Sequence, residues 1–233
     1  MTFRCYRCHA PVSSRGECAC KDGCCLIHAD CREVLTYLPH VDAVVTDPPY
    51  AIPTVVAQGR SVTRNIGDLT IVEAGLRVFF DLIFGRLTPE GRAFIFCDQT
   101  SYPILFRLFY GNQMGLLVWN KGRIGMGREF RKSFELILHL WYPDTPLFSD
   151  GKGRADVLNI KPVGDERQHP AEKPVDLVKE LLAVCGDLIL DPFVGSGTTL
   201  RAAKDLGRRC IGIEIEEKWV AVAAERLRQG VLL

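Results

Sequence analysis

Short apolar runs alternate with longer amphipathic segments along most of the chain. The apolar runs predict strands at residues 24–28, 42–46, 93–97, 116–119, 134–140, 186–190 and 210–215. The segments between them predict helices, because their apolar residues recur every three or four positions. These helices are expected at residues 32–38, 72–87, 103–109, 174–184, 198–206 and 217–228. The alternation predicts an α/β fold with an open, mostly parallel sheet and helices on both faces.

Three stretches lack this periodicity. Residues 1–23 differ from the rest in composition, so we expect a small N-terminal Cys-rich module followed by one large domain over residues 24–233. Residues 51–70 are polar and contain glycine, which predicts a loop. Residues 143–168 belong to a longer polar segment, and a loop of this length in a compact domain usually carries a function, so we expect it to be a candidate target-recognition loop.

Composition limits the partners that the chain can have. Of its 233 residues, 47% are hydrophobic, which is enough to fill a sizeable core. The net charge is only +1, so contact with nucleic acid must come from local basic patches. No apolar run is long enough to span a membrane, and the first residues lack a secretory signal, so we expect a cytoplasmic protein.

Seven of the ten cysteines fall within residues 5–31, at one end of a chain that otherwise reads as cytosolic. Such clustering favours a metal site over disulfide bonds. The candidate zinc ligands form two close pairs: Cys5, Cys8, Cys18 and Cys20. Cys24 or Cys25 is an alternative to Cys20, and a cluster of reduced structural cysteines is the alternative to zinc.

The strand at residues 42–46 runs directly into Asp47, Pro48, Pro49 and Tyr50. Proline fixes φ and carries no N–H, so this turn is stiff and its carbonyls remain able to accept hydrogen bonds from a ligand. A carboxylate, a rigid carbonyl and an aromatic ring at one point suit a planar ring that bears an amino group. The alternative is a strand-capping turn in which Tyr50 is simply packed.

A second motif, residues 191–199, links a predicted strand to a predicted helix and contains two glycines. Glycine lets the backbone approach a ligand closely, and a helix N-terminus favours a polar or anionic group. Glu214 ends the next strand, where nucleotide-binding α/β folds hydrogen-bond ribose hydroxyls. No lysine precedes Thr198, so the motif is not a phosphate-binding P-loop. These features predict a cofactor that contains a nucleoside.

Together these motifs resemble the DNA amino-methyltransferases that use S-adenosylmethionine. The resemblance runs from about residue 26 to residue 227 and includes residues 118–122, 134–138 and 169–174. The catalytic tetrapeptide precedes the cofactor loop, which is the circularly permuted order of the subgroup called beta. The chain departs from the family in its opening strand, where Ala29 stands in place of the usual glycine.

The resemblance implies transfer of a methyl group to the exocyclic amino nitrogen of adenine in DNA after base flipping. Asp47 and the Pro48 carbonyl would accept the amino hydrogens and Tyr50 would stack on the base, while Phe134 is either the opposite stacking face or a core residue. Aspartate at the first position favours adenine, with cytosine-N4 methylation as the alternative. From another class, the alternative is a catalytically silent, zinc-containing DNA-binding protein of the same fold.

The resemblance also implies a cofactor site. Asp191 and the glycine loop would hold the methionine moiety and Glu214 the ribose, while Asp30 would lie near the adenine. His169 and Lys173 would close over the cofactor, although Lys173 could instead be a solvated charge at a helix start. The full set of implied cofactor-binding residues is Asp30, His169, Lys173, Asp191, Phe193, Gly195, Gly197, Thr198 and Glu214.

A basic, glycine-containing loop at residues 121–132 is the candidate grip on double-stranded DNA. Its basic residues are Lys121, Arg123, Arg128, Arg131 and Lys132. A generic charged loop is the alternative. By analogy with the family a homodimer is a candidate assembly, and a partner restriction nuclease remains open.

Overall fold

The computed structural model describes residues 3–13, 15–48, 54–57, 60–63, 69–110, 113–125, 129–143, 145, 153–164 and 172–230. Of residues 54–57, 60–63 and 69–76 the backbone alone is described. Within these ranges, no helix has the length and apolar character needed to cross a membrane.

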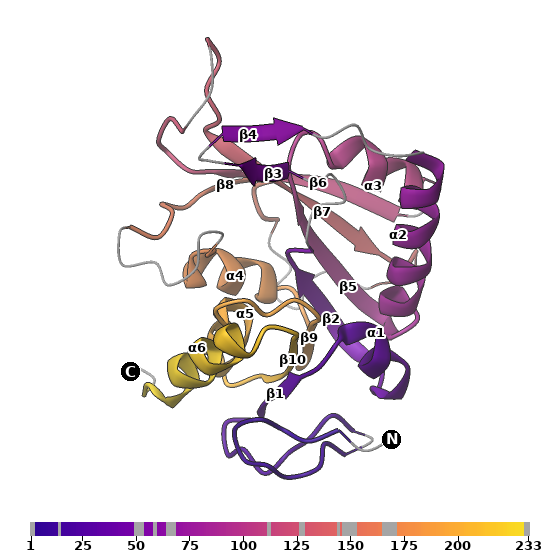
Figure 1. Ribbon diagram of the computed structural model, residues 1–233, viewed down its shortest axis with the longest axis vertical. Helices are drawn as coiled ribbons and strands as arrows, with labels where there is room; N and C mark the ends of the chain where they lie inside the picture. The colour runs from indigo at the N-terminus through magenta and orange to yellow at the C-terminus, as the bar shows by residue number, and fades with distance from the viewer. Residues whose placement is uncertain are drawn as a thin grey trace.

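An eight-stranded sheet forms the centre of the molecule (Figure 1). From one edge to the other its strands are β1 (Cys24–His28), β10 (Arg209–Glu214), β9 (Leu188–Asp191), β2 (Val41–Thr46), β5 (Leu87–Cys97), β7 (Phe134–Trp141), β6 (Gln113–Asn120) and β8 (Val157–Asn159). All neighbouring pairs are parallel except those that include β7, which is antiparallel to both β5 and β6. The predicted fold class, an open and mostly parallel sheet, is confirmed.

Helices cover both faces of the sheet (Figure 1). One face carries α1 (Cys31–Val34), the 3₁₀ turn η1 (Leu35–Tyr37), α2 (Leu69–Phe84) and α3 (Tyr102–Phe109); the other carries α4 (Val175–Leu182), α5 (Thr198–Asp205) and α6 (Glu217–Arg228). Successive strand residues point to opposite faces, so Val44 packs in the first core while Ala43 and Val45 pack in the second. Strands buried on both faces explain the nearly continuous apolar runs in the sequence.

The order of strands reverses between β9 and β2. From β9 the chain passes through α5 to β10 on one side, whereas from β2 it passes through α2 to β5 on the other. The two strands are parallel neighbours, with Ala43 beside Ile189 and Val44 beside Leu190. Their carboxyl ends therefore meet at a topological switch point, which is where open α/β sheets bind ligands.

Two regions differ from the expected elements. The predicted loop at residues 51–70 contains a two-stranded antiparallel sheet, β3 (Thr54–Ala57) and β4 (Arg60–Thr63), and α2 already begins at Leu69. The β-branched valines and threonines of these short strands favour extended backbone, although each strand is too short to show a period. In the long polar segment, β8 adds a further strand beside β6.

Residues 3–23 pack against the outer edge of the sheet, below β1 in Figure 1. The Tyr6 N–H donates to the Leu26 carbonyl of β1 at 2.7 Å. The Arg7 guanidinium binds the Asp22 carboxylate through both of its terminal nitrogens, at 2.8 and 2.7 Å. The Arg7–Asp22 pair braces the Cys-rich segment internally, while Tyr6 and the bond from Arg7 to the Cys24 carbonyl at 2.9 Å tie the segment to the sheet. The predicted boundary at residue 23 stays a prediction.

Candidate active site

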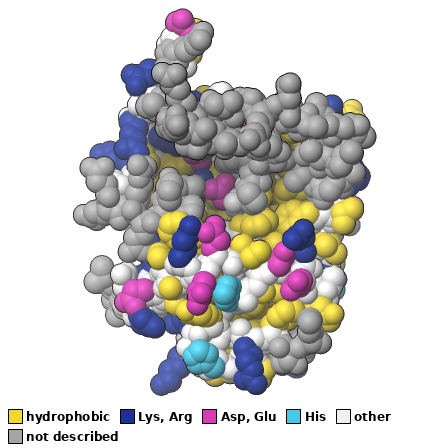
Figure 2. All heavy atoms as spheres, viewed as in Figure 1, with side chains coloured by type: hydrophobic (Ala, Val, Ile, Leu, Met, Phe, Trp, Pro, Cys, Tyr) yellow, Lys and Arg dark blue, Asp and Glu magenta, His cyan; other side chains and the backbone are white. Residues whose placement is uncertain are grey.

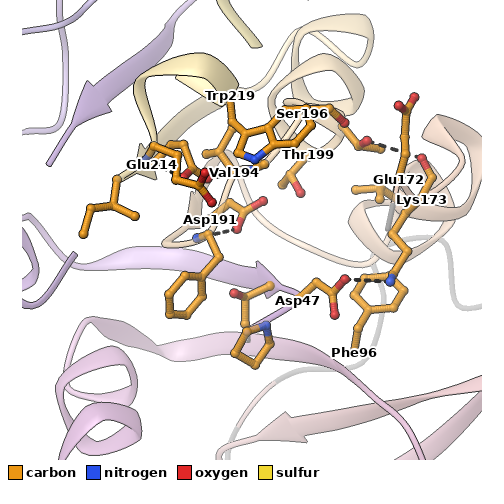
Figure 3. Close-up of a pocket in the computed structure, with 18 residues that line it drawn as sticks. Asp47, Phe96, Glu172, Lys173, Asp191, Val194, Ser196, Thr199, Glu214 and Trp219 are labelled. Atoms are coloured by element: carbon orange, nitrogen blue, oxygen red, sulfur yellow. Dashed lines mark hydrogen bonds and ion pairs between the residues drawn. The ribbon is translucent and has the colours of Figure 1, made fainter. Parts of the chain in front are cut away.

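A cavity of about 390 Å³ lies at the carboxyl ends of β2 and β9, within the size range of ligand-binding pockets. Its lining comes from the strand ends, the loop before α5, and the starts of α4 and α6. Figure 3 shows Glu214 at one end of the cavity, Asp47 at the other, and Asp191 between them. The switch point thus brings together three carboxylates that the sequence places far apart.

The two glycines of the loop before α5 have different roles. Gly195 lines the cavity and has a φ of +52°. Gly197, with φ +86°, caps the N-terminus of α5. A Cβ atom on Gly197 would lie 2.9 Å from the Cβ of Ala223, so this glycine lets α5 pack against α6. Gly197 is absent from the cavity lining, which includes Phe193, Thr198 and Thr199.

Asp191, the last residue of β9, is buried in the cavity wall. Burial raises the pKa of its carboxyl group to about 7, although hydrogen bonds from the Thr199 side chain and the Phe193 N–H partly oppose this shift. The latter bond is 3.0 Å long. Among the described residues no basic side chain forms an ion pair with Asp191, so its buried carboxylate is suited to a cationic group of a ligand.

Glu214 ends β10 and is held by backbone donors. Its Oε2 accepts from the Gly195 N–H at 2.9 Å, and its Oε1 accepts from the Glu216 N–H at 2.8 Å. Each carboxylate oxygen has a second lone pair, so the group can also accept hydrogen bonds from ligand hydroxyls. The glycine loop and the acidic strand end are therefore directly linked.

Asp47 belongs to a partly buried chain of alternating charges, in which only Lys173 is fully buried. The Lys173 ammonium lies 2.6 Å from Asp47 Oδ2 and 3.1 Å from Glu135 Oε2. Glu135 Oε1 is in turn 2.6 Å from the ammonium of Lys121. Burial alone would lower the pKa of Lys173, but the two carboxylates more than offset it, so its pKa is raised. Burial likewise opposes ionisation of Glu135, yet Lys173 and Lys121 hold its pKa below the usual value.

The direction of β7 explains how Glu135 reaches this chain. β7 is antiparallel to β5, so its first residues lie at the edge where the parallel strands end. Lys121, one residue beyond β6, lies at the same edge. The sequence did not point to a function for Glu135. Only the fold shows that the start of β7 lies beside the carboxyl ends of the parallel strands.

Only some of the other predicted site residues line the cavity. Pro48 lines the cavity beside Asp47, whereas Pro49, Tyr50 and His169 lie outside the described residues. Asp30 is not part of the cavity lining. Its carboxylate instead caps α1, accepting from the Arg32 N–H at 2.9 Å, and pairs with the Arg32 guanidinium. Its assignment to the adenine stays a prediction.

The segment between β6 and β7 projects from the body of the molecule (Figure 1). Arg123, Arg131 and Lys132 are exposed on it, whereas Lys121 is held in the partly buried charge chain and Arg128 lies outside the described residues. Figure 2 shows Lys and Arg side chains along the same margin, while acidic and basic groups are interspersed lower on this face. The projecting segment therefore offers a local cationic surface.

The four predicted metal ligands come together. The Sγ atoms of Cys5, Cys8, Cys18 and Cys20 all lie within 4.8 Å of one another. The Cys5 and Cys20 sulfurs are 3.6 Å apart, far longer than a disulfide bond and close to the spacing around a tetrahedral zinc ion. Cys24 and Cys25 are buried residues of β1 and are not members of this group, although the Cys25 thiol interacts with those of Cys5 and Cys18.

Two residues of α6 near the cavity escaped prediction, one in its lining and one that contacts lining residues. Trp219 lines the cavity, and Arg226, two turns later, donates to the Ser196 carbonyl at 3.1 Å and to Thr198 Oγ1 at 3.1 Å. Arg226 also pairs with the buried carboxylate of Glu172. Their seven-residue spacing placed both on one helix face, but the amphipathic pattern did not reveal that this face meets the cofactor loop.

The fold and this site define an α/β protein with a ligand-sized cavity at the switch point of its sheet. The family model N6_N4_Mtase, described as DNA methylase, matches residues 41–225. The chain therefore belongs to this family of DNA methylases, the N6/N4 amino-methyltransferases.

Related proteins cover nearly the whole chain. The type II methyltransferase M2.LlaDCHI of Lactococcus lactis subsp. cremoris is 41% identical over 90% of this chain and 91% of its own. The putative methylase YubD of Escherichia coli (strain K12) is 30% identical over 86% of this chain and 88% of its own.

Two solved structures share the fold. One is the complex of M1.HpyAVI with SAM, with a TM-score of 0.67, 24% identity and coverage of 88% of this chain and 100% of that chain. The other is the cytosine-N4-specific PvuII DNA methyltransferase, with a TM-score of 0.65, 16% identity and coverage of 91% and 88%.

Proposed function

We propose that this protein is an S-adenosylmethionine-dependent DNA methyltransferase that methylates the exocyclic N6 amino group of adenine in double-stranded DNA. The observation that carries the proposal is the position of Asp47. Its carboxylate lies at the end of a switch-point cavity whose other end holds Glu214. A catalytic acceptor and a nucleoside-binding carboxylate thus share one cavity.

The cavity fits the cofactor. The buried Asp191 carboxylate suits the ammonium of the methionine moiety, and Glu214 has acceptor capacity for the ribose hydroxyls. Trp219 and Phe193 provide apolar surface in the same wall. M1.HpyAVI, which has this fold, was solved in complex with SAM. When bound, S-adenosylmethionine supplies an electrophilic methyl group on a cationic sulfur, which an amino nitrogen takes up with loss of one proton.

Asp47 and Pro48 would act on the target base. The lone pair of an exocyclic amino group is delocalised into the ring, so the nitrogen is a weak nucleophile. The Asp47 carboxylate and the Pro48 carbonyl can each accept one amino hydrogen, which favours a tetrahedral nitrogen with its lone pair turned toward the methyl group. Accurate placement and acceptors matched to the developing positive charge both lower the barrier. Base flipping, with stacking on Tyr50, remains part of this prediction.

Adenine is favoured over cytosine because family members with an initial aspartate in the tetrapeptide more often act on adenine. Cytosine-N4 methylation is the alternative, and identifying the methylated base separates the two. The homodimer and the partner nuclease stay predictions.

The DNA would be held by the projecting segment between β6 and β7. Arg123, Arg131 and Lys132 are exposed there, and the adjoining small cavity includes Lys132 in its lining. With a net charge of only +1, the chain depends on such a local surface for contact with phosphates.

We also infer that the N-terminal thiols hold a structural zinc ion. Four sulfurs within 4.8 Å of one another match the ligand set of a closed tetrahedral site. A segment of about twenty residues has little core of its own, so metal binding would supply its folding free energy.

The test of the proposed function is methyl transfer by wild type and by Asp47→Asn. Purified protein is incubated with duplex DNA and methyl-labelled cofactor, and label in the DNA is counted. Wild type is expected to label the DNA, and Asp47→Asn is expected to lose at least about 100-fold in rate while binding cofactor normally. A fully active Asp47→Asn variant would contradict the assignment of Asp47.

A further inference from the structure

We propose that Lys173, held in place by Glu135, is a positioning residue for the Asp47 carboxylate. This inference rests on the proposed function and replaces the expected contact of Lys173 with the cofactor. In this assignment the Glu135–Lys173 pair orients the carboxylate that receives the target amino group.

The first support is the geometry of the contact. The Lys173 ammonium donates to Asp47 Oδ2 at 2.6 Å, as Figure 3 shows. Its side chain is only 9% exposed, and its ammonium lies 5.0 Å from the centre of the Phe96 ring. A short, buried, charge-assisted hydrogen bond is strong and directional. It therefore restricts rotation of the carboxylate about its own axis.

The second support is that Lys173 is itself restrained. Glu135 Oε2 is 3.1 Å from the Lys173 ammonium, and Glu135 Oε1 is anchored by Lys121 at 2.6 Å. A lysine side chain is long and flexible, so it positions a partner only when both of its ends are held. Here the backbone end is also fixed, because the Lys173 carbonyl accepts from the Thr198 hydroxyl at 3.3 Å.

The third support is charge. Four groups alternate in sign along the chain Lys121, Glu135, Lys173 and Asp47. The Lys173 ammonium lies within ion-pair distance of both Asp47 and Glu135, so removing it would take away a positive charge that offsets the repulsion between these two carboxylates. Like charges at this separation disfavour joint ionisation, so one carboxylate would hold a proton at higher pH. A protonated Asp47 would be a poorer acceptor for the amino group.

The surrounding charged groups bear on any pH effect. Beside Glu135, a small cavity of about 170 Å³ has Asp98, Lys121 and Lys132 in its lining. Beyond Asp47, the larger cavity contains Glu172, Asp191, Glu214 and Glu216. Because several of these groups titrate, the effect of Lys173 is measured as a difference between variants.

The experiment compares wild type with Lys173→Gln, Lys173→Arg and Glu135→Gln. The control is Lys179→Gln, which removes a lysine of α4 that pairs with Asp205 of α5 at 2.7 Å and does not line the cavity. Single-turnover methyl transfer is measured at saturating cofactor and DNA over a range of pH. The cofactor Kd is measured separately by calorimetry, and each variant's thermal midpoint is recorded.

Lys173→Gln is expected to lower the saturated rate by about 100-fold while leaving the cofactor Kd unchanged. The acidic limb of its rate profile should move to higher pH. Lys173→Arg should recover much of the rate, Glu135→Gln should lose about tenfold, and Lys179→Gln should match wild type.

A Lys173→Gln variant with a weaker cofactor Kd and an undiminished saturated rate would make Lys173 a cofactor ligand and overturn the inference. Unchanged rate and unchanged Kd would overturn it as well. If the thermal midpoint of Lys173→Gln lies far below that of Lys179→Gln, the inference is tested instead by the saturated rate and the cofactor Kd of Lys173→Arg and Glu135→Gln. A wild type that transfers no methyl group to DNA would refute the proposed function itself, whereas an active wild type with an active Lys173→Gln refutes this inference alone.

Discussion

The raised pKa of Asp191 predicts a pH-dependent affinity for the cofactor. Burial raises this pKa from 3.8 to about 7 in the protein without ligand. Below that value the carboxyl group is neutral and attracts an ammonium group only weakly. As pH rises toward 7 the group ionises, so cofactor binding should strengthen. An α-ammonium loses its own charge near pH 8, so affinity is expected to be highest between about 7 and 8.

The magnitude follows from the shift. Each pKa unit corresponds to about 1.4 kcal/mol, so ionising the buried Asp191 costs about 4 kcal/mol relative to the unfolded chain. Because Asp191 must lose one proton before it binds the cofactor, the cofactor Kd should fall about tenfold for each unit by which the pH rises toward 7. The same shift affects stability: protonated Asp191 contributes fully below pH 3.8, and this contribution is lost as pH rises to about 7.

Both effects can be measured against Asp191→Asn, whose side chain does not titrate. Calorimetric titrations with S-adenosylmethionine from pH 5 to 8 give the Kd, and urea unfolding without cofactor gives the stability. The variant should bind weakly with a flat profile, and its free energy of unfolding should lack the decline that wild type shows between pH 4 and 7. A wild-type Kd that is constant over this range, or an equal slope in the variant, would refute the reasoning.

Three further predictions concern other parts of the molecule. Removing metal with a chelator, or the substitution Cys8→Ser, should lower the thermal midpoint, whereas Cys185→Ser, outside the cluster, should not. A molar ratio of zinc to protein near zero, measured on protein purified with a reductant, would contradict the site. Gly197→Ala should cost about 1–3 kcal/mol in urea unfolding, because φ is +86° and the new Cβ would meet α6 at 2.9 Å. Gly207→Ala, which shares a positive φ but meets nothing within 4 Å, should cost less, and equal losses would count against the packing argument. Arg131→Ala should reduce the slope of log K for DNA against log salt by about one, and an unchanged slope would remove it from the phosphate contacts.

The local features of the fold were predictable from the sequence. Apolar runs of five or six residues gave the buried strands β1 and β2, because strands covered on both faces need apolar residues at every position. The β3–β4 hairpin was missed because its strands have only four residues each and no apolar face long enough to show a period. The order of strands, and with it the switch point, is a property of long-range pairing that periodicity does not contain.

The site was predictable where one short segment carries the chemistry. Asp191 ends β9 and Asp47 directly follows β2, and each begins a distinctive motif, so their meeting followed from the parallel sheet. Lys173 was predicted as a site residue, but its ion pair with Glu135 was not. Glu135 lies on β7, whose antiparallel direction the sequence pattern does not reveal. The assignment of Gly197 to cofactor binding stays a prediction, and its close approach to Ala223 of α6 is a packing feature that the sequence pattern does not contain.

The most direct test of the central claim is the chemical identity of the methylated base. Duplex DNA is incubated with the purified protein and labelled S-adenosylmethionine, then digested to nucleosides that are separated by mass. The account predicts the label on N6-methyladenine. Label on N4-methylcytosine would overturn the choice of adenine, and label on neither base would contradict the assignment of Asp47 and its cavity to DNA methylation.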